Sequence, residues 1–141
     1  NGSPSVSGKT PFTDVRTDEW YSAAVLWAYQ NGIVTGMSDT TFAPINNVTR
    51  EQMTKMFYGY AEFMDYNTMA VADLSAFADG GSVSSWAQTM MGWAVANSLI
   101  KGAQDGNATY LRPQGVATRA EAAAILHRFD QWRVNAVVTG K

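Results

Sequence analysis

The chain has 141 residues, of which 46% are hydrophobic and 12% aromatic, and this composition is typical of a folded protein rather than a disordered one. Its net charge of −2 and the absence of any Lys- or Arg-rich run argue against a nucleic-acid-binding protein. Cysteine is absent, which excludes disulfides and thiolate metal sites, and no apolar run reaches the roughly 18 residues that span a membrane.

An internal duplication organises the chain. Short strings recur in the same order: Phe12-Thr13-Asp14 as Phe77-Ala78-Asp79, Trp20 as Trp86, Trp27-Ala28 as Trp93-Ala94, and Thr49-Arg50 as Thr118-Arg119. The offset between matching residues grows from 65 to 69, which places an insertion around residues 104–110. We therefore predict two tandem copies of one structural repeat.

These matches divide the chain into five parts. Residues 1–10, rich in Gly, Ser and Pro, are predicted to be a linker from an upstream part of a larger protein. The first repeat covers 11–66, a connection covers 67–75, the second repeat covers 76–134, and 135–141 form a tail.

The first helix of each repeat is predicted from residues at helical spacing. They are Trp20, Ala24, Trp27, Ala28 and Asn31 in the first repeat, and Trp86, Met90, Trp93, Ala94 and Asn97 in the second. Asp18 is the expected N-cap of the first helix, and Gly32 stands where a left-handed stop belongs. The second repeat offers Ser84 or Ser85 as the cap and has Ser98 in place of Gly32, which predicts a less sharp helix end.

Long ordered loops are predicted over residues 33–48 and 99–117, where Gly and Pro recur. These connections could include short extended pieces, such as one at 41–43. Asp105-Gly106-Asn107 is expected to form a plain turn, because it lacks the repeated acids of a calcium-binding loop. Residues 73–75 could add a helical turn. The predicted fold class is all-α, with two helix-loop-helix repeats packed in a pseudo-symmetric bundle.

The second helix of each repeat is predicted to begin at a capping box. Thr49-Arg50-Glu51-Gln52 and Thr118-Arg119-Ala120-Glu121 both place Thr at the N-cap and Gln or Glu at N3. Arg50 and Arg119 thus stand at N1, where the helix dipole disfavours a cation. A nearby anion should offset this cost. It could be an internal partner, Asp14 or Asp79, or an external ligand held by the arginine and free helix N–H groups. The residues alone leave both interpretations open.

The ordered motifs resemble the S-layer homology (SLH) domain family over residues 11–132. The strings are Phe12-Thr13-Asp14-Val15, Trp20-Tyr21, Trp27-Ala28, Gly32-Ile33-Val34-Thr35-Gly36, Thr41-Phe42-Ala43-Pro44, Val48-Thr49-Arg50-Glu51-Gln52, Phe77-Ala78-Asp79, Trp93-Ala94-Val95, Leu99-Ile100-Lys101-Gly102, Leu111-Arg112-Pro113 and Thr118-Arg119-Ala120-Glu121. The resemblance implies a non-catalytic extracellular module that tethers exported proteins to the bacterial cell wall. It also implies binding to secondary cell-wall polysaccharides, often ones carrying pyruvate ketals, which would supply an anionic carboxylate.

The same resemblance implies a set of glycan-binding residues. In the family, the Arg of the capping motif, the Asp of the Phe-x-Asp motif and groove aromatics line the site. Carried over, they are Arg50, Arg119, Asp14, Asp79, Trp20 and Trp86. SLH modules usually carry three repeats, and only two are found here. A third repeat outside this chain, a groove completed by another chain, or the loss of one site would account for this. The second repeat is less regular, so Arg50 is the better candidate.

Two other classes of function are weighed against this one. An enzyme is disfavoured, because His127 is the only histidine and no nucleophile, phosphate-loop or metal motif accompanies it. We expect no catalytic residue, cofactor or metal site, and no binding to nucleic acid or insertion into a membrane. The alternative is a protein–protein interaction or oligomerisation module of a larger exported protein, since the aromatics and the missing repeat would suit a homo-oligomer.

Overall fold

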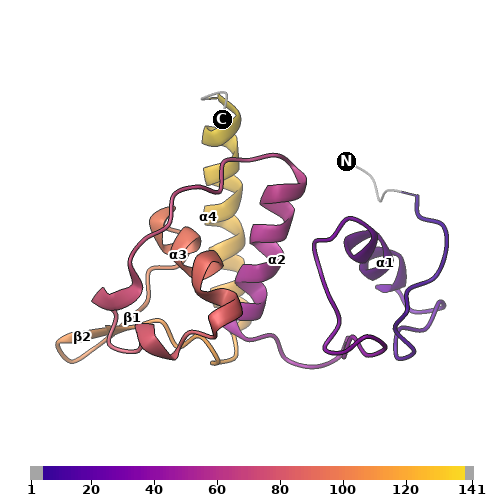
Figure 1. The fold of residues 1–141 in the computed structure, drawn as a ribbon, viewed down its shortest axis with the longest axis horizontal. Coiled ribbons are helices and arrows are strands. Elements are labelled where there is room, and N and C mark those ends of the chain that lie inside the picture. The colour runs from indigo at the N-terminus through magenta and orange to yellow at the C-terminus, as the bar shows by residue number, and fades with distance from the viewer. Residues whose placement is uncertain (1–4, 139–141) are drawn as a thin grey trace. The chain divides into compact units, whose positions relative to one another are not determined.

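The computed structural model describes residues 5–138, so the first four residues of the predicted linker and the last three of the predicted tail lie outside the described residues. The helices are α1 (Ser22–Gln30), α2 (Arg50–Phe63), α3 (Gln88–Ala96) and α4 (Arg119–Val138). Short 3₁₀ helices are η1 (Leu74–Ala76), η2 (Gly80–Ser82) and η3 (Ser85–Ala87), and the strands are β1 (Ala103–Asp105) and β2 (Ala108–Tyr110) (Figure 1). The helical turn predicted at 73–75 is therefore present as η1, which the Asp73 side chain caps.

The all-α prediction is wrong, because the loop of the second repeat contains a two-stranded antiparallel sheet. Ala103 pairs with Tyr110 and Asp105 with Ala108, which leaves Gly106 and Asn107 as the connecting turn. Gly106 has a φ of +60°, and such left-handed backbone favours glycine and allows a two-residue hairpin turn. The predicted turn is thus confirmed, but it closes a hairpin. Residues 41–43 of the first repeat form no strand.

Two compact units make up the chain, residues 1–46 and 47–141. This division falls inside the first repeat, because α2 belongs to the second unit. The first unit holds α1 and a small core of Phe12, Val15 and Val25, against which Tyr21 and Phe42 pack.

The core of the second unit lies where α2, α3 and α4 meet (Figure 1). Trp93 on α3 is 0% exposed, and its ring contacts Tyr58 of α2 and Trp132 of α4 edge-on, at centroid distances of 5.3 and 5.2 Å. Phe57 of α2 and Phe129 of α4 pack with ring centroids 5.0 Å apart. Aromatic pairs in these geometries add to the stabilisation from apolar burial, so α2 of the first repeat shares one core with α3 and α4 of the second.

Both predicted capping boxes are confirmed. In α2, the Thr49 side chain accepts from the Gln52 N–H, and the Gln52 side chain accepts from the Thr49 N–H. In α4, Thr118 and Glu121 make the same reciprocal pair, at 3.1 and 2.8 Å. Because these boxes satisfy helix N–H groups from within the chain, they fix where each second helix begins.

The predicted caps of the first helices are wrong. Tyr21 is the N-cap of α1 and makes no side-chain cap bond, while Asp18 instead pairs with Arg16. The Ser84 hydroxyl donates to buried Glu51 at 2.7 Å rather than capping the helix that follows. At the other end, Gly32 takes the predicted left-handed conformation with φ +70°, and Ser98 takes the same one with φ +59°. The second repeat therefore ends its first helix as sharply as the first does.

Candidate functional site

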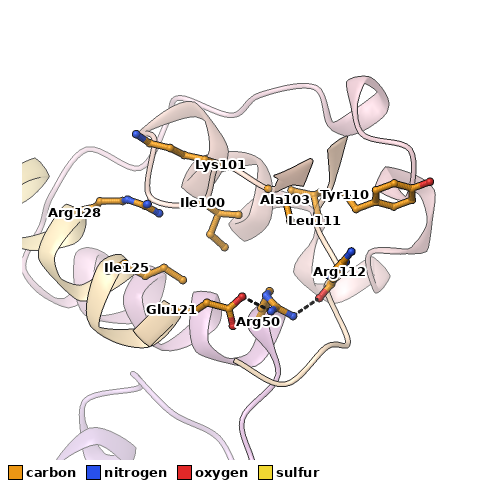
Figure 2. A pocket seen from close by; sticks show the side chains of 12 residues that line it. Arg50, Ile100, Lys101, Ala103, Tyr110, Leu111, Arg112, Glu121, Ile125 and Arg128 are labelled. Atoms are coloured by element: carbon orange, nitrogen blue, oxygen red, sulfur yellow. Dashed lines mark hydrogen bonds and ion pairs between the residues drawn. The ribbon is translucent and has the colours of Figure 1, made fainter. Parts of the chain in front are cut away.

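A pocket of about 190 Å³ lies in the second unit, between the start of α2, residues 121–128 of α4 and the segment 100–112 (Figure 2). Four cationic residues line it, namely Arg50, Lys101, Arg112 and Arg128. The remaining walls are Glu121, Tyr110, Ile100, Leu111, Ile125, Gly102, Ala103 and Ala124. Four cations against one carboxylate give the lining a clear positive excess, although the whole chain has a net charge of −2. Such a concentration of cations suits an anionic ligand.

Arg50 is held in place by two partners within the chain. One guanidinium nitrogen, Nη2, lies 2.5 Å from Glu121 Oε1, and the other, Nη1, donates to the Arg112 carbonyl oxygen at 3.4 Å (Figure 2). A Cβ atom at Gly115 would lie only 2.3 Å from Nη1, so the glycine leaves room for the guanidinium. The anion required near this N1 cation is therefore supplied internally by Glu121, rather than by the aspartates considered from sequence.

The first N–H groups of α2 are also occupied. The Arg50 N–H donates to the Gly115 carbonyl oxygen and the Glu51 N–H to the Pro113 carbonyl oxygen, each at 3.0 Å. The Gln52 N–H donates to the capping Thr49. The N–H groups of Arg50, Glu51 and Gln52 are therefore not free to bind an external anion. Such free groups were part of the external-ligand interpretation of the sequence.

Glu121 serves two helices at once. Its Oε1 accepts from Arg50 of α2, and its Oε2 accepts from the Thr118 N–H of α4 at 2.8 Å. The Arg50 hydrogen bond, followed by the bond from the Thr118 backbone, lowers the pKa of the Glu121 carboxyl below its ordinary value. The carboxylate form that pairs with Arg50 is therefore stabilised.

The two aspartates of the Phe-x-Asp motifs support loops. Asp79 accepts from the Leu111 and Arg112 N–H groups, both at 2.7 Å, and this holds the segment that forms one pocket wall. Asp14 makes the equivalent pair in the first unit, with the Phe42 and Ala43 N–H groups at 2.9 and 2.7 Å. The Phe42 hydrogen bond is the largest cause of the lowered pKa of Asp14. We call each such pair of hydrogen bonds an aspartate clamp. In both repeats the second N–H of the clamp belongs to a residue with left-handed backbone, Arg112 at φ +51° or Ala43 at φ +59°.

The other residues implied by the family resemblance are not part of the pocket lining. Arg119 is exposed at the start of α4. Trp20 is 90% exposed in the first unit, and Trp86 is 46% exposed on η3, where the Lys55 amine lies 5.6 Å from its ring centroid. Of the six residues, the pocket therefore includes only Arg50, with Asp79 supporting its wall.

Sequence reasoning missed most of the pocket, although a signal was present. The repeat alignment pairs Lys101 with Thr35, Arg112 with Ala43, Arg128 with Gly59 and Glu121 with Gln52. At each of these pocket positions the second repeat carries a charge where the first does not. A comparison of the repeats for their differences would have singled out these four residues, whereas only the structure shows that they line one pocket.

The chain belongs to the S-layer homology domain family, whose pattern matches residues 11–54 and 76–123. It is 36% identical over 121 residues to a surface-layer 125 kDa protein of Lysinibacillus sphaericus, covering 86% of this chain and 10% of that protein. An exoglucanase of Acetivibrio thermocellus is 33% identical over 116 residues, 82% of this chain and 10% of the enzyme. A cell surface protein of Thermoanaerobacter kivui is 32% identical over 119 residues, covering 84% and 15%.

The chain thus spans about a tenth of the length of the first of these relatives, and the likeness to an enzyme is confined to that part. An SLH domain is a non-catalytic module for anchoring at the cell wall, and the relatives support an extracellular location at the cell surface or wall. Over the described residues, 5–138, no helix is long and apolar enough to cross a membrane. The same residues include no cluster of His, Cys, Asp or Glu that could hold a metal ion.

Proposed function

We propose that this chain anchors a larger exported protein by binding an anionic secondary cell-wall polysaccharide in the cationic pocket of its second unit. A pyruvate ketal on the glycan would supply the carboxylate. The observation that carries the proposal is the excess of cations around one hollow in a chain whose net charge is negative. Charge-assisted hydrogen bonds from guanidinium and ammonium groups to carboxylates are the contacts that such a site can offer.

The pocket also offers surfaces for the sugar itself. Ile100, Leu111 and Ile125 provide apolar contact, whereas the Tyr110 ring points away from the other labelled side chains (Figure 2). A pocket with apolar walls and a few polar groups fixes the orientation of a ligand while the cations provide attraction. Of the residues implied by the family, Arg50 lies in this pocket. Contacts between the glycan and the other five residues remain predictions, which alanine substitution can test. The five are Arg119, Asp14, Asp79, Trp20 and Trp86.

The test is co-sedimentation with purified wall sacculi of Lysinibacillus sphaericus, the source of the S-layer relative. The chain should bind untreated sacculi, and mild acid that removes ketals and glycan should abolish the binding. Raising the salt concentration from about 0.05 to 0.5 M should weaken the binding, because salt screens partly exposed charges. Binding that ignores both acid treatment and salt would contradict an electrostatic glycan site.

A further inference from the structure

The charges of the pocket come mostly from the second repeat. Lys101, Arg112 and Arg128 all belong to it, and the first repeat has Thr35, Ala43 and Gly59 at the matching positions. Arg50 is the only pocket cation from the first repeat. The duplication therefore separates the pocket cations into two groups: one arginine in the capping motif that both repeats share, and three cations that only the second repeat has.

The shared arginine is already neutralised. Arg50 forms its ion pair with Glu121, bonds the Arg112 carbonyl oxygen, and has a side chain only 16% exposed. A ligand carboxylate that took over this guanidinium would have to displace Glu121, which would leave a second carboxylate without its partner in the same pocket. Removing one member of a partly buried pair leaves the other charge poorly compensated, which makes such an exchange unfavourable.

The three cations of the second repeat are not neutralised in this way. Among the described residues, neither Lys101 nor Arg128 forms an ion pair with a carboxylate, and one Arg128 nitrogen donates to the Leu99 carbonyl oxygen at 3.2 Å. Arg112 approaches Asp105 only at 3.7 Å, and their side chains are 52% and 71% exposed. An exposed pair at this distance contributes little, so Arg112 can turn to a ligand at small cost.

We propose that Lys101, Arg112 and Arg128 bind the anionic group of the glycan, and that Arg50, whose charge Glu121 cancels, does not contact it. The two side-chain hydrogen bonds of Arg50 join the starts of α2 and α4 to the segment that carries Arg112 (Figure 2). This assignment rests on the proposed function. It changes the residue expected to contact the ligand from the shared arginine to the cations of the second repeat.

The first experiment changes Arg50 and Glu121 separately and together. Gln can replace Glu121 without loss of the capping box, because Gln52 fills that role in α2. In Arg50→Gln the unpaired Glu121 should repel the ligand and weaken binding to sacculi about fivefold, whereas Glu121→Gln should strengthen it about threefold. The double variant removes one charge of each sign, so it should bind within about threefold of the wild type.

A ligand-contacting Arg50 predicts a different order. The double variant would then bind as poorly as Arg50→Gln, because the contact would be missing from both, and this outcome would overturn the proposal. Circular dichroism and melting of each variant monitor the fold, and a purely structural role for the pair cannot explain stronger binding by Glu121→Gln.

The second experiment gives the pocket the residues of the first repeat. Ala43 shows that Ala tolerates the left-handed backbone found at Arg112, so Lys101→Thr with Arg112→Ala should fold normally. Binding to sacculi should fall about tenfold or more, since two cations are lost. Arg133→Gln, which removes a partly exposed cation of α4 outside the pocket lining, is the matched control and should bind like the wild type.

These experiments distinguish a failure of the proposed function from a failure of the assignment of the ligand-binding cations. If the wild type ignores sacculi, the proposed function fails and the assignment fails with it. If the wild type binds but the double variant of Lys101 and Arg112 binds equally well, the glycan function stands and the assignment of its cations is wrong.

Discussion

Arg50 and Glu121 form an ion pair that joins the first turns of two helices from different repeats. Arg50 is the N1 residue of α2, and Glu121 is the N3 residue of α4 and part of its capping box. The helix dipole disfavours a cation such as Arg50 at N1 and favours an anion such as Glu121 in the first turn. The ion pair with Glu121 therefore offsets the cost of placing Arg50 at the start of α2. The pair thus couples the beginnings of α2 and α4 across the pocket.

Acid should weaken this coupling. Because the folded chain holds the pKa of Glu121 below its ordinary value of 4.5, the pair stabilises the fold above that pH and loses its effect as the pH falls through the lower folded pKa. Thermal unfolding of the wild type and Glu121→Gln from pH 7 to pH 2.5 measures this. The wild type should lose more stability below about pH 4.5 than the variant does. Parallel curves would show that the pair adds no pH-dependent stability.

The aspartate clamps should control local opening. Asp79→Ala removes a carboxylate that accepts two N–H groups, and should cost about 2 kcal/mol of unfolding free energy. Hydrogen exchange should accelerate at the Leu111 and Arg112 amides. Asp14→Ala is the matched control, which should accelerate exchange at Phe42 and leave Leu111 protected. Unchanged protection in Asp79→Ala would contradict the clamp.

Trp93 should tolerate Phe far better than Ala. The Trp93 ring is fully buried, and among the described residues its Nε1 has no hydrogen-bond partner. Trp93→Ala should cost about 3–5 kcal/mol through the cavity it creates. Trp93→Phe loses less volume and also removes the unsatisfied N–H, whose burial costs about 1–3 kcal/mol, so its net cost should be much smaller. Urea unfolding measures both, and equal losses would argue that Nε1 is satisfied in solution.

Gly92 should resist replacement although it lies inside α3. Alanine favours a helix interior over glycine by about 1 kcal/mol, which alone predicts stabilisation. A Cβ at this position, however, would lie 2.5 Å from Val71 Cγ1 and 2.9 Å from the Ala72 carbonyl oxygen. We expect Gly92→Ala to destabilise the chain by about 1–3 kcal/mol, because the clash includes backbone. Gly81→Ala, where a Cβ meets nothing within 4 Å, is the control in thermal melts.

The parts of the fold that sequence predicts well are those set by local chemistry. The capping boxes at Thr49 and Thr118 depend on residues three positions apart, and both form. Gly32 likewise stops α1 through its own backbone freedom. The hairpin was missed because β1 and β2 are three residues each, too short for a periodic pattern.

The parts that sequence could not predict depend on contacts between distant segments. Ser84 would suit an N-cap locally, but its hydroxyl donates to Glu51, 33 positions away in the chain. Glu121 was assigned to a capping box, and only the packing of α2 near α4 shows that its second oxygen holds Arg50, 71 positions away in the chain. The sequence therefore predicted one residue of the candidate site, Arg50, which belongs to the motif that both repeats share. The other cations of the pocket come together only in the three-dimensional structure.

The division of the chain at residue 47 has a consequence for anyone who wishes to transplant the module. Cutting at the sequence repeat, to fuse residues 76–134 to a cargo enzyme, would leave behind α2, which supplies Arg50 and part of the wall around Trp93. A fusion that starts at residue 47 carries the second unit with its pocket complete. The segment suited to fusion therefore begins inside the first copy of the duplicated sequence. Recombination at the repeat boundaries would separate α2 from the rest of the second unit.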